Sequence, residues 1–277
     1  MPELPEVETV RRSLEPALYD GAVTKVDASR LLLRQRPIDR AGMARALIGA
    51  RFVAARRHGK YLLLDASSGH TLLVHLGMAG QLLLVDGKDA EQRHTHVAIG
   101  LSSGLALRFV DPRRFGIVRL YATAVVAASA ELAALGPDPL VGAFQEEALA
   151  AALGRTKRDL KSALLDQSIL AGLGNIYVSE ALFEARLSPR RRAHCLRPRE
   201  HAALFAAIGQ VLRRAVENRG TTLSDYVDAS GRSGENQHAL LVYGRAGEPC
   251  RVCGNKVRRI VQAGRSSFFC PSCQPSR

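Results

Sequence analysis

The sequence predicts an α+β protein in which a strand-rich N-terminal part precedes a helical part and a short cysteine-bearing end. Three observations support this prediction. Short apolar runs separated by turn residues fill positions 50–121, helical patterns begin after Pro139, and two Cys-x2-Cys pairs follow residue 249. We therefore expect three domains, at 1–135, 136–240 and 241–277.

The expected strands alternate with turn signals. Apolar and β-branched residues concentrate at 61–64, 71–76, 81–85, 96–99, 105–110 and 116–121. Between some of them lie hairpin-type turns, at Ser67-Ser68-Gly69, Asp86-Gly87 and Ser102-Ser103-Gly104. Because such short connections leave no room for crossover helices, the sheet should be antiparallel and form a sandwich or a barrel.

Helices are expected on both sides of this stretch. Before it, Pro5 can occupy the first helical position, and an apolar stripe follows at Val7, Val10 and Leu14. After a predicted inter-domain hinge at 135–139, the pattern favours helices at 144–153, 159–165, 175–185 and 198–218. Gly220 is expected to end the last of them.

The charge balance points modestly to a nucleic-acid partner. Lys and Arg number 39 against 26 Asp and Glu, a formal net charge of +13. Such a field attracts polyanions, and counterion release makes the binding favourable and salt-sensitive, although a basic protein without this partner remains an alternative. No apolar run reaches the roughly 18 residues of a membrane span, and the N-terminus lacks the regions of a secretory signal. We therefore expect no membrane partner and a cytoplasmic location.

Four of the five cysteines have the spacing of a zinc site. Cys250 and Cys253 form one Cys-x2-Cys pair, and Cys270 and Cys273 form the other, 16 residues later. Two disulfides are the alternative, but they are rare in a cytosolic chain. Four thiolates fill the tetrahedral shell of Zn²⁺, so we expect one structural ion rather than a catalytic one. Cys195 lies outside the pattern and is interpreted as an incidental thiol.

The cysteine-bearing end is strongly basic. From Tyr243 onward Glu248 is the only acid, against Arg245, Arg251, Lys256, Arg258, Arg259, Arg265 and Arg277. A zinc-held basic hairpin favours a nucleic-acid contact, with a solvated basic face as the alternative.

The first residues permit a nucleophile. Removal of Met1 would leave Pro2 as a secondary amine beside Glu3, and an α-amino group has a reference pKa of about 8 against about 10.4 for lysine. The acids Glu3 and Glu6 would raise the pKa of this amine, whereas a helix N-terminus would lower it. The residues alone therefore leave open a nucleophile or a simple acidic helix start.

Six motifs occur together in an order similar to that of formamidopyrimidine-DNA glycosylases. They are PELPEVETVRR at the start, GKYLL around Lys60, HLGMAG around Met78, DPRRFG around Arg113, GLGNIYVSEALF from Gly172, and the terminal cysteine finger. The similarity covers essentially the whole chain. It implies an N-terminal antiparallel β-sandwich with flanking helices, a helix–two-turn–helix domain and a zinc-finger hairpin. It also implies a monomeric enzyme of base-excision repair that acts on oxidised purines in damaged double-stranded DNA.

The resemblance implies chemical roles for four residues. Pro2 would attack C1′ of the damaged nucleotide and form a Schiff base, and Glu3 would act as general acid and base at the sugar. Lys60, in the turn before a strand, would hold a phosphate and assist β-elimination. Arg265 on the finger would contact phosphates and assist δ-elimination. Ordinary surface cations are the alternative interpretation of Lys60 and Arg265.

It also implies contacts to the DNA. His94, Arg113 and Asn175 would bind the backbone, with Arg155 or Lys157 as further candidates. Met78, Arg113 and Phe115 would fill the gap left by an extruded base, as apolar wedges do when a base is flipped. Without the resemblance, Asn175 would be read as a helix cap, and Met78 and Phe115 as core residues.

Two further observations qualify this interpretation. His94 and His96 lie two apart and are expected to share one strand face, but no third ligand nearby suggests a second metal. Ser224 stands where the family often has Lys, and the loop 231–237 lacks an expected aromatic residue. In the family this region is associated with covering the flipped base, so these departures concern lesion preference rather than the chemistry at the sugar.

Two other functions are compatible with these motifs. One is an endonuclease VIII-like glycosylase for oxidised pyrimidines, a related branch that differs after the first Pro-Glu. The other is a non-enzymatic DNA-binding protein built on the zinc hairpin.

Overall fold

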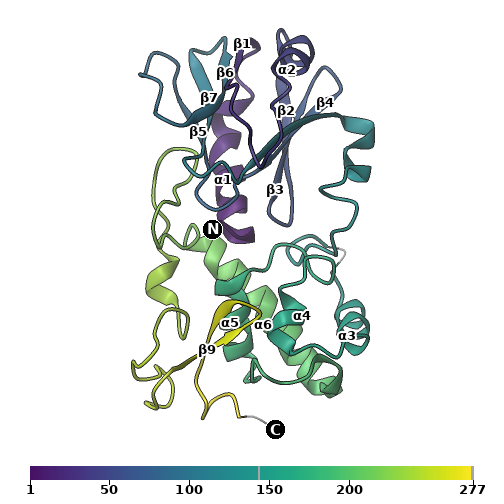
Figure 1. Ribbon diagram of the computed structural model, residues 1–277, viewed down its shortest axis with the longest axis vertical. Helices are drawn as coiled ribbons and strands as arrows, with labels where there is room; N and C mark the ends of the chain where they lie inside the picture. The colour runs from purple at the N-terminus through teal and green to yellow at the C-terminus, as the bar shows by residue number, and fades with distance from the viewer. Residues whose placement is uncertain (143, 276–277) are drawn as a thin grey trace. The chain divides into compact units, whose positions relative to one another are not determined.

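The computed structural model describes residues 1–142 and 144–275, and the chain forms two compact units (Figure 1). The first unit consists of Met1–Ala133 and Asn218–Gln237, and the second of Ala134–Glu217 and His238–Arg277. In this division Asn218–Gln237 packs with the N-terminal unit, and the segment predicted as a separate finger domain shares a unit with the helices. Arg277, one of the predicted finger cations, lies outside the described residues.

Two antiparallel four-stranded sheets form the first unit. One has the order β1-β6-β7-β5, made of Val23–Ala28, Thr95–Leu101, Leu105–Val110 and Gln81–Asp86. The other has the order β2-β3-β4-β8, made of Phe52–His58, Tyr61–Ala66, His70–His75 and Ile117–Ala122. Every pairing within them is antiparallel, as the short turns predicted.

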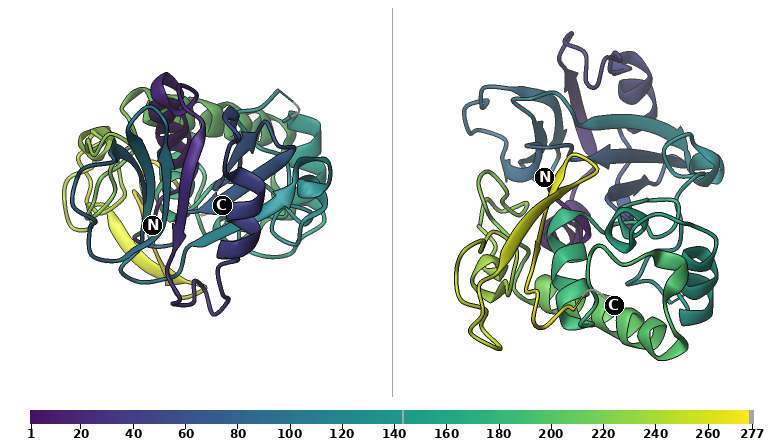
Figure 2. Two further views of the ribbon diagram at one scale, coloured as in Figure 1. Left: turned by 90° about the horizontal axis from the view of Figure 1, so that it is seen from above. Right: turned by 60° about the horizontal axis from the view of Figure 1, so that its bottom comes forward.

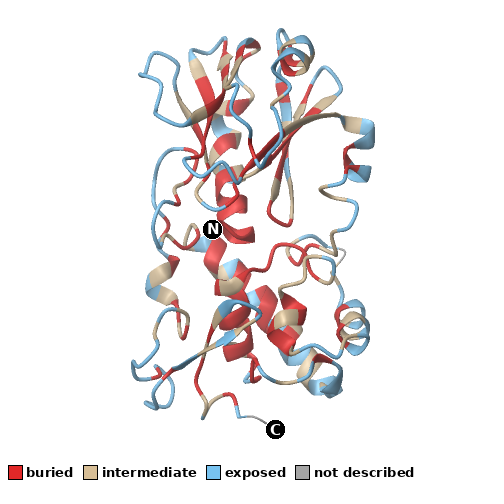
Figure 3. Ribbon diagram, in the orientation of Figure 1, coloured by how far each residue is buried: buried red, intermediate tan, exposed pale blue. Residues whose placement is uncertain are grey.

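One apolar core joins both sheets to helix α1 (Leu4–Leu18). Val10 and Leu14 of the helix, Leu64 of β3 and Ile99 of β6 are fully buried in it. Figure 3 shows that α1 is buried over much of its length. Because two sheets share one core, the unit is a sandwich, and the predicted fold class is confirmed.

Strand β1 and helix α2 (Arg40–Leu47) are among the elements of this unit that were not predicted. Strand β1 buries only two of its six residues fully, and helix α2 buries only Met43 and Leu47. Both elements carry too weak an apolar pattern to be recognised in the sequence, since the hydrophobic period is the main local signal.

The segment Asn218–Gln237 is attached to the edge of the first sheet. The Leu84 N–H of strand β5 donates to the Ala229 carbonyl at 2.8 Å, and the Ala229 N–H donates to Ser13 Oγ of α1 at 3.0 Å. Since β5 is an edge strand, the segment pairs backbone groups that would otherwise be open.

The second unit is helical and carries the finger hairpin. Its helices are α3 (Glu146–Gly154), α4 (Leu160–Leu164), α5 (Asn175–Glu184) and α6 (Pro198–Glu217), within two residues of the predicted bounds. The hairpin strands are β9 (Arg258–Gln262) and β10 (Arg265–Phe269), drawn in yellow in Figure 2. None of the helices in the described part of the chain is long and apolar enough to span a bilayer.

A buried carboxylate connects α5 to the chain that leads into the finger. Glu180 is 1% exposed and accepts the N–H groups of Leu241, Val242 and Tyr243 at 2.8, 3.0 and 2.8 Å. Burial raises the pKa of Glu180, and the three N–H groups oppose this by stabilising the anion. The three donors fix the start of the finger segment on the helix.

Candidate active site and zinc centre

The first residues lie at the positive end of α1. Leu4, rather than Pro5, takes the first helical position, and Glu3 is the N-cap. Pro2 is buried, Glu3 is only 2% exposed, and the Glu3 N–H donates to the Glu6 carboxylate at 2.8 Å. The helix dipole and the Glu6 carboxylate therefore act in opposite directions on any charge at Pro2.

Glu6 also holds the segment Asn218–Gln237. Its other oxygen accepts the Thr221 N–H at 2.7 Å, and its carbonyl accepts the Tyr226 hydroxyl at 3.2 Å. Gly220 has φ +80°, and a Cβ there would come within 3.0 Å of the Glu6 carboxylate. The segment at 221–225, which contains Ser224, is thus anchored on the helix start that carries Pro2 and Glu3.

Lys60 occupies a two-residue turn between β2 and β3. His58 pairs with Tyr61 across the turn, and Gly59 has φ +57°, which glycine adopts without steric cost. Lys60 is only 8% exposed, so it is not an ordinary surface cation.

The first unit contains a pocket of about 1080 Å³. Met1, Met78, Arg113 and Phe115 are among the residues that line it. Met78 and Phe115 are 39% and 48% exposed, so they are not core residues. The Arg113 guanidinium lies 5.1 Å from the centre of the Phe115 ring. The three predicted wedge residues therefore meet in one pocket, beside the N-terminus.

Two local features hold the loops of Met78 and Phe115 close together. Asp111, fully buried, accepts the N–H groups of Arg113 at 3.0 Å and Gly116 at 2.8 Å. Gly77 has φ +63°, and a Cβ at this position would lie 2.6 Å from the backbone of Phe115. Only glycine lets the loop of Met78 approach this closely.

The prediction that His94 and His96 share one strand face is wrong. His94 has φ +70° in the turn before β6, whereas His96 lies within the strand and is 3% exposed. His96 Nε2 lies 3.0 Å from the Asp111 carbonyl, and the Asp111 N–H donates to the His94 carbonyl at 3.0 Å. The exposed His94 is therefore attached to the Arg113 loop through backbone contacts.

In the second unit, Arg265 follows the tight turn of the finger hairpin. Ala263 and Gly264, with φ +46° and +73°, form the turn, and Arg265 opens β10 with an exposed side chain. Both residues at positive φ are typical of a type I′ hairpin turn.

The residue after Arg265 is held by two helices. The Ser266 carbonyl accepts Lys161 Nζ of α4 at 2.6 Å and Asn175 Nδ2 of α5 at 3.0 Å. Lys161 is fully buried and also donates to Ser267 Oγ at 2.7 Å. The position of Arg265 is thereby fixed relative to both helices.

Asn175 does not cap its helix. Gly174 is the N-cap of α5, and the buried Oδ1 of Asn175 has no hydrogen-bond partner within residues 1–142 and 144–275. Arg155 and Lys157 are both exposed, at and after the end of α3. The Lys157 carbonyl accepts Arg192 Nη1 at 3.0 Å, while its side chain remains on the surface.

The four predicted ligand cysteines converge. Their Sγ atoms all lie within 4.8 Å of one another, with 3.9 Å between Cys250 and Cys273 and 3.5 Å between Cys253 and Cys270. Thiolates at the corners of a tetrahedron around zinc lie about 3.8 Å apart. The sulfur atoms therefore fit one Zn²⁺ ion. Cys195 is exposed and not among them.

Comparison with known proteins assigns the chain. Family models match as the formamidopyrimidine-DNA glycosylase N-terminal domain at residues 1–118, its H2TH domain at 135–227, and a zinc finger found in FPG and IleRS at 247–275. A formamidopyrimidine-DNA glycosylase of Ruegeria pomeroyi is 48% identical over 99% of this chain and 100% of its own. The chain belongs to the formamidopyrimidine-DNA glycosylase family.

Solved structures of the same family have the same fold. The MutM (Fpg) protein of Thermus thermophilus is 41% identical with a TM-score of 0.88, over 99% of this chain and 98% of its own. A Lactococcus lactis Fpg mutant, solved as a complex with DNA containing Fapy-dG, is 32% identical with a TM-score of 0.91. That match covers 99% of this chain and all of the other.

Sequence reasoning missed one half-buried histidine of this glycosylase. His75, within the HLGMAG motif, lines the pocket, and its Nδ1 accepts the Gly77 N–H at 3.0 Å. Burial and the charges of Lys60 and Arg34 lower the pKa of His75 to about 4. The ring is therefore neutral at pH 7, with its proton on Nε2.

Lys161 was also missed. The sequence predicts only that Lys161 lies in a helix. No local pattern distinguishes a lysine that becomes buried from one that stays solvated. Its role in holding Ser266 depends on a contact across 105 residues.

Proposed function

We propose that this chain excises oxidised purines from duplex DNA and then cuts the strand at the resulting abasic site. Membership of the formamidopyrimidine-DNA glycosylase family over the full length supports the proposal. The Lactococcus lactis relative is described in complexes with Fapy-dG DNA and with DNA containing an abasic site. The main observation behind the proposal is the start of α1. There Pro2 and Glu3 directly follow Met1, which lines the same pocket as Met78, Arg113 and Phe115.

Pro2 is the proposed nucleophile. Met1 lines the pocket, so its removal would leave the Pro2 amine at the pocket wall. The amine lone pair forms a bond to C1′ as the bond from C1′ to the base breaks, and the departing base takes a proton. Opening of the sugar ring then gives a Schiff base, which acts as the electron sink for later steps.

Glu3 is the proposed general acid and base. As the N-cap of α1, it adjoins Pro2 and can donate a proton to the ring oxygen as the sugar opens. In β-elimination, loss of a proton from C2′ expels the 3′ phosphate. In δ-elimination, a second proton loss expels the 5′ phosphate. Lys60 is proposed to assist the first elimination, and Arg265 the second.

The remaining predicted residues are proposed to bind the DNA. His94, Asn175 and Arg113 would contact phosphates, with Arg155 or Lys157 as additional contacts. Met78 and Phe115 would occupy the space of the extruded base together with Arg113, because the three line one pocket and two of them expose apolar surface.

Zinc is proposed to have a structural role and no catalytic one. The four cysteines fill its coordination shell, so the bound ion would hold the hairpin of Arg265 and supply no open position for water.

The protein is proposed to have three functional parts: a catalytic sandwich, a helix–two-turn–helix DNA-binding part and a zinc-finger hairpin. We also propose that the enzyme is a monomer located in the cytoplasm, where binding to DNA associates it with the nucleoid.

Borohydride trapping tests the proposed function. A duplex with 8-oxoguanine opposite cytosine should give a covalent complex, and mass spectrometry should find the cross-link at the N-terminal Pro2. A duplex with thymine glycol should be processed more slowly. Preference for thymine glycol would favour an oxidised-pyrimidine glycosylase, and the absence of any trapped complex would favour a non-enzymatic DNA-binding protein. A cross-link at Lys60 would contradict the assignment of Pro2.

A further inference from the structure

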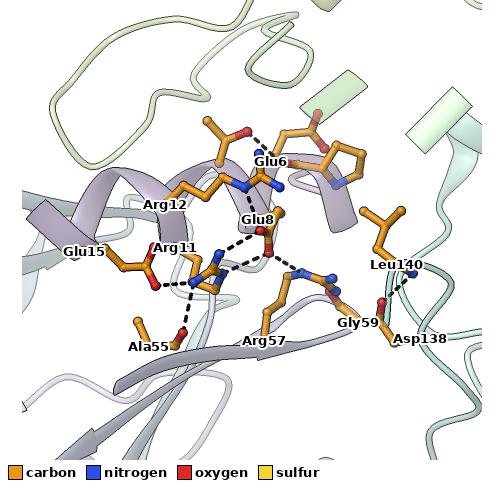
Figure 4. A network of polar contacts seen from close by, with 12 residues as sticks. Glu6, Glu8, Arg11, Arg12, Glu15, Ala55, Arg57, Gly59, Asp138 and Leu140 are labelled. Atoms are coloured by element: carbon orange, nitrogen blue, oxygen red, sulfur yellow. Dashed lines mark hydrogen bonds and ion pairs between the residues drawn. The ribbon is translucent and has the colours of Figure 1, made fainter. Parts of the chain in front are cut away.

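A buried arginine contacts both α1 and the turn that carries Lys60. The Arg57 side chain of β2 is 3% exposed, and its Nε lies 3.1 Å from Glu8 Oε2 of α1. Its Nη1 donates to the Gly59 carbonyl at 3.0 Å. Figure 4 shows Arg57 between the helix and the strand end, directed toward Glu8.

Glu8 is a fixed, charged partner for this arginine. Its carboxylate also accepts Arg12 Nε at 2.8 Å and Arg11 Nη2 at 3.0 Å. Burial alone would raise the pKa of Glu8, but the hydrogen bonds from Arg11 and Arg12 and the charges of Arg11 and Arg57 lower it to about 2. Glu8 therefore remains ionised at every pH at which the enzyme would work.

The Gly59 carbonyl belongs to the peptide group that joins Gly59 to Lys60. In a two-residue hairpin turn, the orientation of this central peptide distinguishes one turn type from another. Glycine at φ +57° has access to several of these conformations, so Gly59 by itself selects none. The hydrogen bond from Arg57 stabilises one orientation and with it the backbone of Lys60.

We propose that Arg57 is a positioning residue, which with Glu8 holds the Lys60 turn in register with the start of α1. The proposal rests on the proposed function, in which Lys60 acts at the phosphate while Pro2 and Glu3 act at the sugar. These groups reach the same nucleotide only if the helix and the turn keep a fixed separation. A guanidinium can bind two acceptors with Nε and Nη1 at once, whereas the single ammonium of lysine cannot reproduce this fork.

The neighbouring Arg56 provides a matched control. Its side chain is 47% exposed and pairs with Asp65 on the adjacent strand β3. It donates to Asp65 through Nε and Nη2, and no contact of Arg56 with the turn is among those that the structure describes. Substitution of Arg56 removes the same charge from the same strand without removing the hydrogen bond to Gly59.

The experiment measures single-turnover nicking of a pre-formed abasic site by full-length Arg57→Lys, Arg57→Met, Glu8→Gln and Arg56→Met. Binding to a tetrahydrofuran abasic analogue and thermal unfolding are measured on the same preparations. We expect Arg57→Met and Arg57→Lys to slow nicking about 10- to 100-fold, as misplacing a reacting group does, with affinity changed less than about threefold. Glu8→Gln, which acts on the turn through Arg57, should slow nicking by a smaller factor. Arg56→Met should match the wild type.

The outcomes separate this inference from the proposed function. If Arg57→Met fails to fold, the folded Arg57→Lys decides the question, because it keeps the charge and most of the side-chain volume. Unchanged nicking by Arg57→Lys and Glu8→Gln, or an equal loss in Arg56→Met, would overturn the positioning role while leaving the enzyme's activity established. A wild-type protein that nicks no abasic site would instead contradict the proposed function.

Discussion

Two carboxyl groups near the start of α1 are placed in different surroundings. Glu8 faces Arg11, Arg12 and Arg57, which keep it ionised. Glu3 is the N-cap of the helix, almost fully buried and adjacent to Pro2. The same residue type can thus serve as a permanent anion at one position and as a candidate proton carrier at another.

Glu3→Gln separates the two proposed chemical steps. Breaking the glycosidic bond requires proton transfer at the sugar, which well-placed acid–base catalysis accelerates by about 10²–10⁴-fold. An abasic aldehyde condenses with an amine without a base to expel. We therefore expect Glu3→Gln to lose excision of 8-oxoguanine and still nick a pre-formed abasic site, in two single-turnover assays. Glu15→Gln on the same helix is the control, and equal loss on both substrates would assign Glu3 to Schiff-base chemistry in general.

Glu8 should contribute to stability in a defined pH range. Its pKa falls from an ordinary value of 4.5 to about 2 on folding. Because the folded pKa is the lower one, the contribution is complete above about pH 4.5 and is lost as the pH falls toward 2. We expect Glu8→Gln to lower the free energy of unfolding by about 3 kcal/mol at pH 7, with a smaller difference from wild type at pH 3.

Urea unfolding at several pH values measures this effect. A difference between Glu8→Gln and wild type that is constant from pH 7 to pH 3 would show that the Glu8 charge is not the cause.

At the scale of elements, the finger depends on its cysteines. Its core contains only a few buried residues, and two of the five are Cys250 and Cys270. So small an apolar cluster cannot hold a hairpin without a metal or a disulfide. Gln274 adds a polar attachment, since its Nε2 donates to the Leu187 carbonyl at 2.8 Å.

Cys253→Ala should release zinc and weaken DNA binding while the sandwich stays folded. Loss of one thiolate opens the tetrahedral shell, and the hairpin that carries Arg265 then loses its support. Zinc content, affinity for a duplex with an abasic analogue, and circular dichroism of the strands are measured together. Cys195→Ala, at an exposed position, should leave all three unchanged. Normal affinity in zinc-free protein would contradict the prediction.

At the scale of the whole molecule, the net charge of +13 should make DNA binding strongly dependent on salt. Each lost phosphate contact lowers the slope of log K against log salt by about 0.9. We expect this decrease for Arg265→Met and no change for Arg45→Met, which removes an exposed charge from α2. Titrations at several salt concentrations provide the slopes, and equal slopes for both variants would exclude a phosphate contact by Arg265.

Local signals in the sequence determined much of this molecule. Short turns predicted antiparallel sheets, periodic apolar residues predicted α5 and α6 within one residue of their ends, and Cys-x2-Cys spacing predicted the metal cluster. Each of these features depends on residues that are close together in the chain. Charge, similarly, is a sum over residues and needs no structure.

Tertiary structure alone decided the surroundings of the candidate active site. The bond from Thr221 to Glu6 spans 215 residues and that from Arg57 to Glu8 spans 49. Local propensity contains no information about such partners, since they are brought together by packing of the whole unit. For the same reason the sequence assigned Asn218–Gln237 to the helical domain, whereas its hydrogen bonds to α1 and β5 attach it to the sandwich.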